Sequence, residues 1–216
     1  MPVKEEIVKV CHLVYQNKFV AAYDGNISAL TENNSVMITR SGICKGEVTI
    51  SDIIETDLNG NKISGEGKLS TENKLHLYIY NKRKDAKAVV HCHPVFTTAL
   101  GLVENKYLDI FFPEVFLTLG KIPVCEYATP STQEVTDSIA EFIETSNALI
   151  LKNHGAVTIG SSVMDAYYKM EKLEHAAKTI LFAKLLGSPR KLSAEDINKL
   201  LSIAESTYGI KTDKLF

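Results

Sequence analysis

The chain has 216 residues, of which 45% are hydrophobic and 23% charged, which suffices for one sizeable core. Its formal charge of -2 comes from 24 basic and 26 acidic side chains without any basic block, so the sequence predicts neither a nucleic-acid nor an anionic-membrane partner. No apolar run approaches the roughly 18 residues of a membrane span. We expect a single domain over residues 1–216 that binds a small molecule or another protein.

The four cysteines are widely scattered and include no CxxC pair. The N-terminal stretch "MPVKEEIVKVCHLVY" carries acidic residues where a signal peptide needs an apolar segment. Both features predict a protein of the reduced cytoplasm.

The first half of the chain contains three segments with a clear period. Apolar residues at helical spacing predict a helix within 4–19, and "SVMITRSG" (35–42) is typical of a strand that ends in a turn. The Gly-, Asn- and Ser-rich stretch 57–70 predicts a turn followed by a polar loop. A helical pattern then occupies 70–83.

The second half continues the alternation. We expect a strand over 86–93, and Pro94 is suited to open the next helix. A strand in 120–130 precedes a helix in which Ser131 and Glu134 form a capping-box pattern.

The C-terminal part predicts two strands within 147–160, interrupted at His154 and Gly155. Helices follow from Ser162 to about Leu186 and from a cap at Ser193. Alternating helices and strands without repeats or linkers favour an α/β domain with a helix-covered sheet. The pattern leaves open whether the strands run parallel or antiparallel.

Two histidines stand one residue apart in "AVVHCHP". In a strand, His91 and His93 project to one face and Cys92 to the other, so both imidazoles can reach one ion. Neutral imidazole is a good zinc ligand, and catalytic zinc usually keeps three protein ligands. Taken alone, such a pair is more often made of histidines that only bond loop carbonyls. The third candidate is His154, which ends another apolar segment and is followed by Gly155, a residue that permits a tight turn.

Glu72 begins the helix of "LSTEN", beside Ser70 and Thr71. A carboxylate near zinc serves as ligand or base, although an acid in the first turn is also an ordinary partner of the helix dipole. The remaining histidines, His12, His76 and His175, fall in helical patterns and receive no chemical role, although His76 could face the same side as Glu72.

Three short stretches are suited to an anion. The amides and hydroxyls at the start of the 70–83 helix would suit a phosphate, and "DGNIS" and "TRSG" supply backbone amides and small polar side chains that approach phosphate oxygens closely. Each of the last two is also typical of a simple turn.

In chain order, "DGNIS", "ITRSG", "KLSTE", "AVVHCHP", "IPVCEYATP" and "LILKNHGAV" resemble the class II aldolase/adducin family, most closely its L-fuculose-phosphate aldolase group. The resemblance implies a three-layer αβα fold whose central, largely antiparallel sheet is flanked by helices. It also implies a cyclic homotetramer with active sites at subunit interfaces.

The resemblance further implies the site residues. Zinc, or another divalent cation, would be held by His91, His93 and His154, and Glu72 would be the catalytic carboxylate that also approaches the metal. A pocket for the substrate phosphate would comprise Asn26, Ser41, Gly42, Ser70 and Thr71.

The implied reaction is reversible cleavage of a ketose 1-phosphate into dihydroxyacetone phosphate and a small aldehyde. Related epimerases carry aspartate where this chain has Glu72, which favours an aldolase. Tyr208 in "STYGIK" matches a tyrosine that closes the neighbouring subunit's site, and it is also suited to a helix end. Phe112 stands where the aldolases place a proton-donating tyrosine, so the donor on the aldehyde side stays open. The alternatives are an epimerase, dehydratase or decarboxylase of sugar phosphates, and a non-catalytic adducin-like module.

Overall fold

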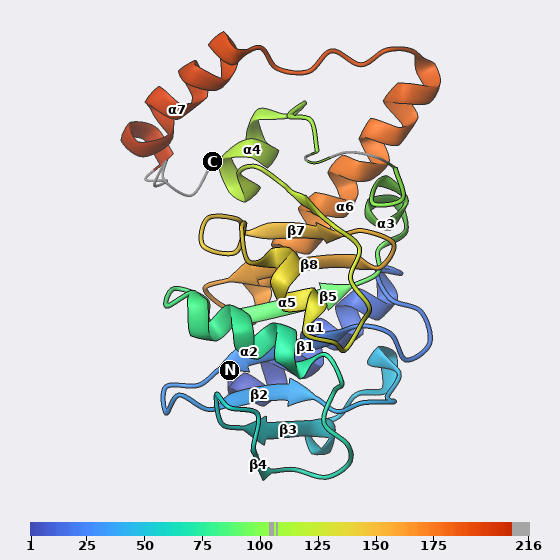
Figure 1. Cartoon of the computed structure of the whole chain (residues 1–216), viewed down its shortest axis with the longest axis vertical. Coiled ribbons are helices and arrows are strands. Elements are labelled where there is room, and N and C mark those ends of the chain that lie inside the picture. The colour runs from blue at the N-terminus through green and yellow to red at the C-terminus, as the bar shows by residue number, and fades with distance from the viewer. Residues whose placement is uncertain (104–105, 107, 209–216) are drawn as a thin grey trace.

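The computed structural model describes residues 1–103, 106 and 108–208, apart from the side chains of Glu205 and Tyr208. Its centre is an eight-stranded sheet with the order β4-β3-β2-β1-β5-β8-β7-β6 (Figure 1). Every pairing is antiparallel except the parallel pair β6 and β7. The strands are β1 (Asn26–Leu30), β2 (Val36–Thr39), β3 (Ile53–Thr56), β4 (Lys62–Ser64), β5 (Ala88–Cys92), β6 (Val124–Cys125), β7 (Ala148–Leu151) and β8 (Gly155–Gly160).

Helices cover both faces of this sheet, which confirms the expected α/β architecture with a largely antiparallel sheet. Helices α1 and α6 pack on one face, and α2 and α5 pack on the other. The helices are α1 (Val3–Gln16), α2 (Asn73–Lys82), α3 (Val95–Leu100), α4 (Pro113–Leu119), α5 (Glu134–Ile139), α6 (Val163–Leu186) and α7 (Ala194–Tyr208), with short 3-10 turns at Lys45–Glu47 and Ile50–Asp52.

Alternation along β5 divides the core into two layers. Val90 and Cys92 pack among residues of α1 and α6, whereas Val89 packs with α2 and α5 on the opposite face. Because side chains alternate along a strand, His91 lies on the face of Val89, away from Cys92. The expected division between the two histidines and Cys92 is therefore confirmed.

The register of three central strands brings distant segments to one edge. Asn26, the first residue of β1, pairs with His91 near the end of β5, and Cys92 pairs with Ala156 near the start of β8. Since all three strands are antiparallel neighbours, residues about 65 positions apart meet there.

Several boundaries follow the predicted signals. Ser162 caps α6 by accepting a bond from the amide of Asp165 at 3.1 Å, and Ser193 accepts from Asp196 at 3.1 Å before α7. Pro94 directly precedes α3. Among the described residues, no helix is both long and apolar enough to cross a membrane.

Other expectations were wrong. Ser131 has a left-handed φ of 68° and does not cap a helix, because the Glu134 carboxylate accepts from the amide of Thr129 instead, and α5 begins only at Glu134. The polar loop expected over 57–70 contains strand β4. The stretch "DGNIS" is a turn only as far as Gly25, and Asn26 already belongs to β1.

Candidate metal and catalytic site

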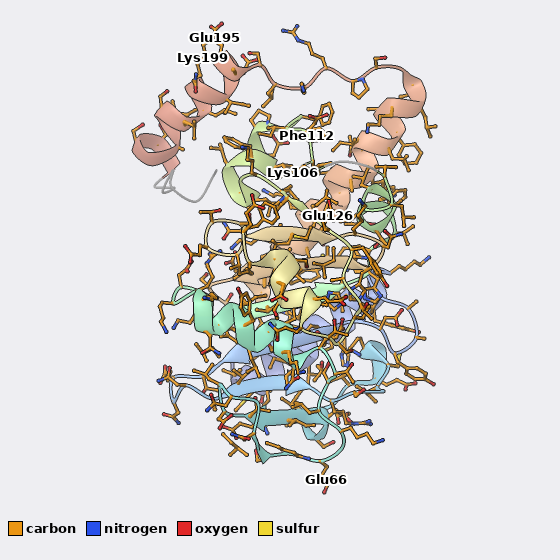
Figure 2. All side chains as sticks on the ribbon, viewed as in Figure 1. Glu66, Lys106, Phe112, Glu126, Glu195 and Lys199 are labelled. Carbon is orange, nitrogen blue, oxygen red and sulfur yellow. The ribbon has the colours of Figure 1, made fainter. Side chains whose placement is uncertain are left out.

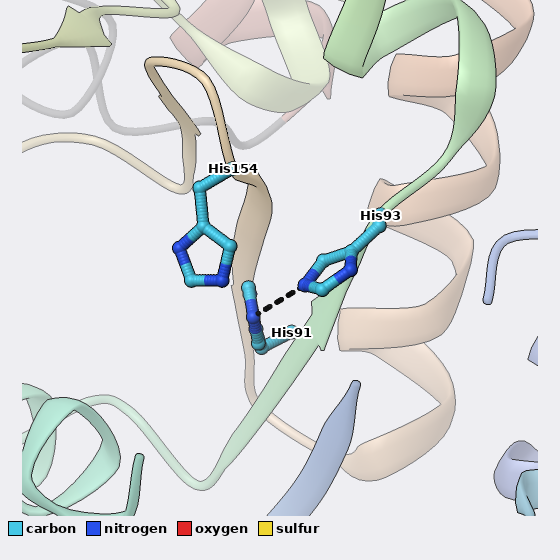
Figure 3. A group of neighbouring side chains, drawn as sticks. All are labelled: His91, His93 and His154. Atoms are coloured by element: carbon cyan, nitrogen blue, oxygen red, sulfur yellow. Dashed lines mark hydrogen bonds between the residues drawn. The ribbon is translucent and has the colours of Figure 1, made fainter. Parts of the chain in front are cut away.

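Three imidazoles meet at this edge of the sheet (Figure 3). His91 belongs to β5, His93 directly follows that strand, and His154 directly precedes β8. One ring nitrogen of each lies within 4.8 Å of the other two, and the ring centroids are 4.8 to 4.9 Å apart. The sequence-predicted histidine cluster therefore exists in the structure.

The backbone around His154 holds this arrangement. Asn153 has the left-handed φ of 57°, a conformation that asparagine tolerates better than most residues. Gly155 is needed for a different reason, because a Cβ there would lie 2.4 Å from the carbonyl oxygen of Cys92 and 2.6 Å from Cδ2 of His93. The expected tight turn is thus made by Asn153, and Gly155 allows β8 to approach β5 closely.

Glu72 completes the cluster from α2. Its Oε2 is 3.3 Å from Nε2 of His91, and its Oε1 is 3.2 Å from Nε2 of His154. Glu72 occupies the N-cap position of α2, but its side chain makes no capping hydrogen bond. Oε1 is buried and has no hydrogen-bond partner of good geometry among the described residues. A buried acceptor without a donor indicates that a further group belongs beside it.

The donor set fits a divalent cation. The Nε2 atoms of His91 and His93 are 3.1 Å apart, marked by the dashed line in Figure 3. Tetrahedral zinc with ligands at about 2.0 to 2.1 Å has ligand atoms roughly 3.3 to 3.4 Å apart, close to this distance and to the two distances from Glu72. Three imidazoles and one carboxylate are a common zinc donor set, and imidazoles also accept other divalent ions.

Partners outside the cluster orient two of the rings. Nδ1 of His91 donates to the carbonyl oxygen of Ala156 at 3.0 Å, so Nε2 is the ring nitrogen that faces Glu72 and His93. Nδ1 of His93 is 3.6 Å from Oδ2 of Asp24. Such second contacts fix the ring orientation of metal-binding histidines.

The electrostatics favour positive charge beside Glu72. Burial alone raises the pKa of Glu72, but the charge of His91 and the contacts with His154 lower it more, and the carboxyl pKa lies well below its usual range. Burial lowers the pKa of His91, yet Glu72 raises it by more. Burial and the charge of His91 lower the pKa of His93 to about 4, so that ring is neutral near pH 7 and able to bind a metal.

Apart from Asn26, the residues predicted to bind phosphate lie on two segments that a backbone hydrogen bond connects. Ser70 is buried and Thr71 exposed, while the amide of Ser41 donates to the carbonyl of Lys68 at 2.9 Å, which ties the two segments together. Gly42 has the left-handed φ of 72°, and among the described residues no atom beyond its chain neighbours lies within 4 Å of the place where a Cβ would be.

Asn26 lies between this region and the histidine cluster. Its side-chain amide donates to Oε2 of Glu72 at 2.8 Å. The amide group has two N–H donors, so one remains for another acceptor.

Lys45 is a functional candidate that sequence reasoning missed. Its side chain is 1% exposed, and Nζ donates to the carbonyl oxygens of Ile43 at 2.7 Å and Tyr23 at 3.2 Å. Ile43 directly follows "TRSG" and Tyr23 directly precedes "DGNIS", so the buried Lys45 side chain links the segments next to the two predicted phosphate-binding loops. No period or motif distinguishes this lysine in the sequence.

Two further predicted residues have other outcomes. Phe112, labelled in Figure 2, directly precedes α4. It lines a separate cavity of about 490 Å³ between α4 and α6, together with Tyr168, Lys172 and His175. The side chain of Tyr208 lies outside the described residues.

Comparison with known proteins agrees with this geometry. The family described as "Class II Aldolase and Adducin N-terminal domain" matches residues 5–181. An L-fuculose phosphate aldolase of Methanococcus maripaludis is 38% identical over 80% of this chain and 93% of its own length. A 3-oxo-tetronate 4-phosphate decarboxylase of Pectobacterium atrosepticum is 34% identical over 91% of both chains.

A solved structure extends the likeness to the fold. The structure titled L-fuculose 1-phosphate aldolase is 31% identical, has a TM-score of 0.87, and is matched over 95% of this chain and 96% of its own. Sequence and fold therefore agree over nearly the whole length. The chain belongs to the class II aldolase and adducin family and is an enzyme of the class II aldolase type.

Proposed function

We propose that the protein is a zinc-dependent aldolase that reversibly cleaves a ketose 1-phosphate, similar to fuculose 1-phosphate, into dihydroxyacetone phosphate and a small aldehyde. The observation that carries this proposal is the convergence of three imidazoles on a buried carboxylate whose Oε1 is 3.2 Å from Nε2 of His154 and makes no hydrogen bond of good geometry. The names of the aldolase relatives support it.

In this proposal Glu72 moves the proton. Its Oε2 is held by Asn26, and its Oε1 is left to take a proton from the carbon beside the substrate carbonyl in the synthetic direction and to return it during cleavage. A divalent cation bound by His91, His93 and His154 would supply Lewis-acid polarisation of that carbonyl. The phosphate would lie against Asn26, Ser41, Gly42, Ser70 and Thr71.

The proposal includes the assembly and the compartment implied by the family resemblance. We expect a homotetramer in which Tyr208 closes a neighbouring subunit's site. All four cysteines are free thiols, which is compatible with a cytoplasmic protein.

A decarboxylase of a sugar-acid phosphate is the second candidate. One relative with this name matches 91% of the chain, and Phe112 stands where the aldolase resemblance expects a proton-donating tyrosine. Both reactions begin by stabilising negative charge beside a carbonyl, so the histidine cluster serves either.

The test is a panel of phosphorylated ketoses and 3-keto sugar-acid phosphates, assayed with enzyme whose metal content is measured by elemental analysis. Release of dihydroxyacetone phosphate, detected with a coupled dehydrogenase, supports the aldolase. Release of carbon dioxide instead would overturn it in favour of the decarboxylase. Absence of turnover by fully metal-loaded enzyme on every compound would contradict both.

A further inference from the structure

A buried chain of hydrogen bonds leads from the interior to Glu72. Tyr80 Oη and Ser28 Oγ are 2.7 Å apart, and Ser28 Oγ is 2.6 Å from Nδ1 of His76. Nε2 of His76 bonds Oδ1 of Asn26, and Nδ2 of Asn26 donates to Oε2 of Glu72 at 2.8 Å. The four side chains that lead to Glu72 in this chain of hydrogen bonds, Tyr80, Ser28, His76 and Asn26, are at most 5% exposed.

The chain is built from the periods of two elements. Glu72, His76 and Tyr80 recur every four residues along one side of α2 and the residue that precedes it. Asn26 and Ser28 are two residues apart on β1 and therefore share a face of the sheet. His76 joins the two rows through its bonds to Ser28 and Asn26. Sequence reasoning assigned His76 no chemical role because these partners are 48 and 50 residues away.

Elementary chemistry fixes the direction of every hydrogen. An ionised carboxylate only accepts, so Asn26 presents its NH₂ to Glu72 and its oxygen to His76. That oxygen only accepts, so Nε2 of His76 carries the proton, and Nδ1 accepts from Ser28, whose oxygen then accepts from Tyr80. Burial, followed by the charge of His91, lowers the pKa of His76 to about 3, in agreement with the neutral ring. All donors thus point toward Glu72.

We propose that His76 is a positioning residue for Glu72, acting through Asn26. Aligned donors in a buried chain strengthen one another, which fixes the Asn26 amide and through it one carboxylate oxygen. Without this support the Glu72 side chain is free to turn toward the first turn of α2, as acidic residues at helix N-termini ordinarily do. A primary amide does not titrate, so the chain orients the carboxylate and does not conduct a proton. This inference rests on the proposed role of Glu72.

The test compares two substitutions of His76. His76→Leu fills the space but removes both polar atoms, whereas His76→Gln retains an N–H near the former Nε2. We expect His76→Leu to lower kcat by about 10- to 100-fold, the usual cost of losing such outer support, with metal content unchanged. His76→Gln should restore kcat to within a few-fold of the wild type. Solvent-deuterium exchange into dihydroxyacetone phosphate should change in parallel with kcat.

Two further variants separate positioning from general stability. His12→Leu removes a different histidine, whose Nε2 bonds the carbonyl of Val48 at 2.9 Å, and should leave kcat unchanged. Ser28→Ala breaks the chain one step earlier, and it replaces His76→Leu should that variant fail to fold. It should reduce kcat less, again with unchanged metal content. Wild-type kcat in folded His76→Leu, or a loss of kcat that follows a loss of metal, would overturn the proposal.

A crystal structure of His76→Leu keeps this inference separate from the proposed reaction. The Glu72 carboxylate should be rotated away from Asn26, and an unchanged carboxylate would overturn the inference whatever the substrate. If the wild type releases carbon dioxide and not dihydroxyacetone phosphate, the aldolase proposal fails, and the kcat comparison is made on that reaction.

Discussion

Glu72 lies where an acidic side chain would ordinarily cap a helix, a contact worth about 1 kcal/mol. Its carboxylate makes no such bond and turns toward His91 and His154. The structure thus forgoes a local stabilising contact in favour of a polar cluster. Departures of this kind from local rules are expected at functional sites.

Replacing Glu72 by Gln should separate metal binding from proton transfer. The three imidazoles remain, so we expect the bound metal to be retained, while proton exchange into dihydroxyacetone phosphate falls by roughly 10²- to 10⁴-fold because the amide is not a base. Elemental analysis and deuterium exchange measure the two effects. Unchanged exchange would remove Glu72 from its proposed role.

Replacing His93 by Ala should lower the metal content, because it removes one of three nitrogen donors. The exposed His175 of α6 offers a matched control, since His175→Ala removes an imidazole that lines the separate α4–α6 cavity. Elemental analysis after dialysis against a weak chelator should show a loss only in His93→Ala. Full metal retention in that variant would exclude His93 as a ligand.

At the scale of residues, sequence reasoning predicted the parts of the site that depend on local spacing. The two-residue period of a strand places His91 and His93 on one face, and the ends of the neighbouring strand and helix patterns suggested His154 and Glu72, to which the family resemblance gave their roles. Lys45 and His76 were not predicted because each acts through side-chain bonds to distant segments. Burial and partner identity are properties of the folded chain and leave no period in the sequence.

At the scale of the elements, β5 and β8 approach each other so closely beside the site that position 155 has no room for a Cβ. In Gly155→Ala the new methyl group would collide with Cys92 and His93. We expect about 1 to 3 kcal/mol of lost stability and weaker metal binding, measured by urea unfolding and metal titration. Gly187→Ala is the control, since nothing lies within 4 Å of its Cβ. Equal effects of the two substitutions would contradict the steric argument.

Glu174 of α6 binds the start of α3, the helix that follows His93 and Pro94. Its carboxylate, 8% exposed, accepts from the amides of Phe96 and Thr97 at 2.9 and 2.8 Å and from the Thr97 hydroxyl at 2.7 Å. Glu174→Ala leaves these donors without an acceptor and should cost about 3 kcal/mol in the free energy of unfolding.

An exposed glutamate provides the comparison for that measurement. Glu195 pairs with Lys199 at 2.6 Å on the surface of α7, as their labels in Figure 2 indicate. Surface ion pairs contribute little to stability. Glu195→Ala should therefore change the free energy of unfolding, measured with urea, by less than about 0.5 kcal/mol. A comparable loss in both variants would mean that the Glu174 contacts are not specific.

Helix ends show where element prediction succeeds and fails. Ser162 and Ser193 cap the helices that follow them, but Ser131, with the same pattern, does not. The difference is local, because the Glu134 carboxylate turns back to the amide of Thr129, five residues earlier. A capping sequence therefore predicts a helix start only where no nearby loop competes for the acid.

For the molecule as a whole, alternation of helices and strands predicted the layers but not the strand order. Strands β1 and β5 are neighbours in the sheet although β2, β3, β4 and α2 lie between them in the chain. Such pairings depend on long-range contacts that a local period does not encode. The family resemblance supplied the largely antiparallel sheet that the pattern left open.

The C-terminal helix α7 is attached to α4 through a small cluster of its own. Phe116 and Ala204 are buried there, apart from the two layers that enclose the sheet. We expect α7 to open as a separate cooperative unit, with backbone amides that exchange hydrogen for deuterium faster than those of β5. Mass spectrometry of peptides from both segments measures this. Equal protection would mean that the whole chain opens only as one unit. Faster exchange in α7 would mean that this helix detaches while the strands that carry the metal site stay folded.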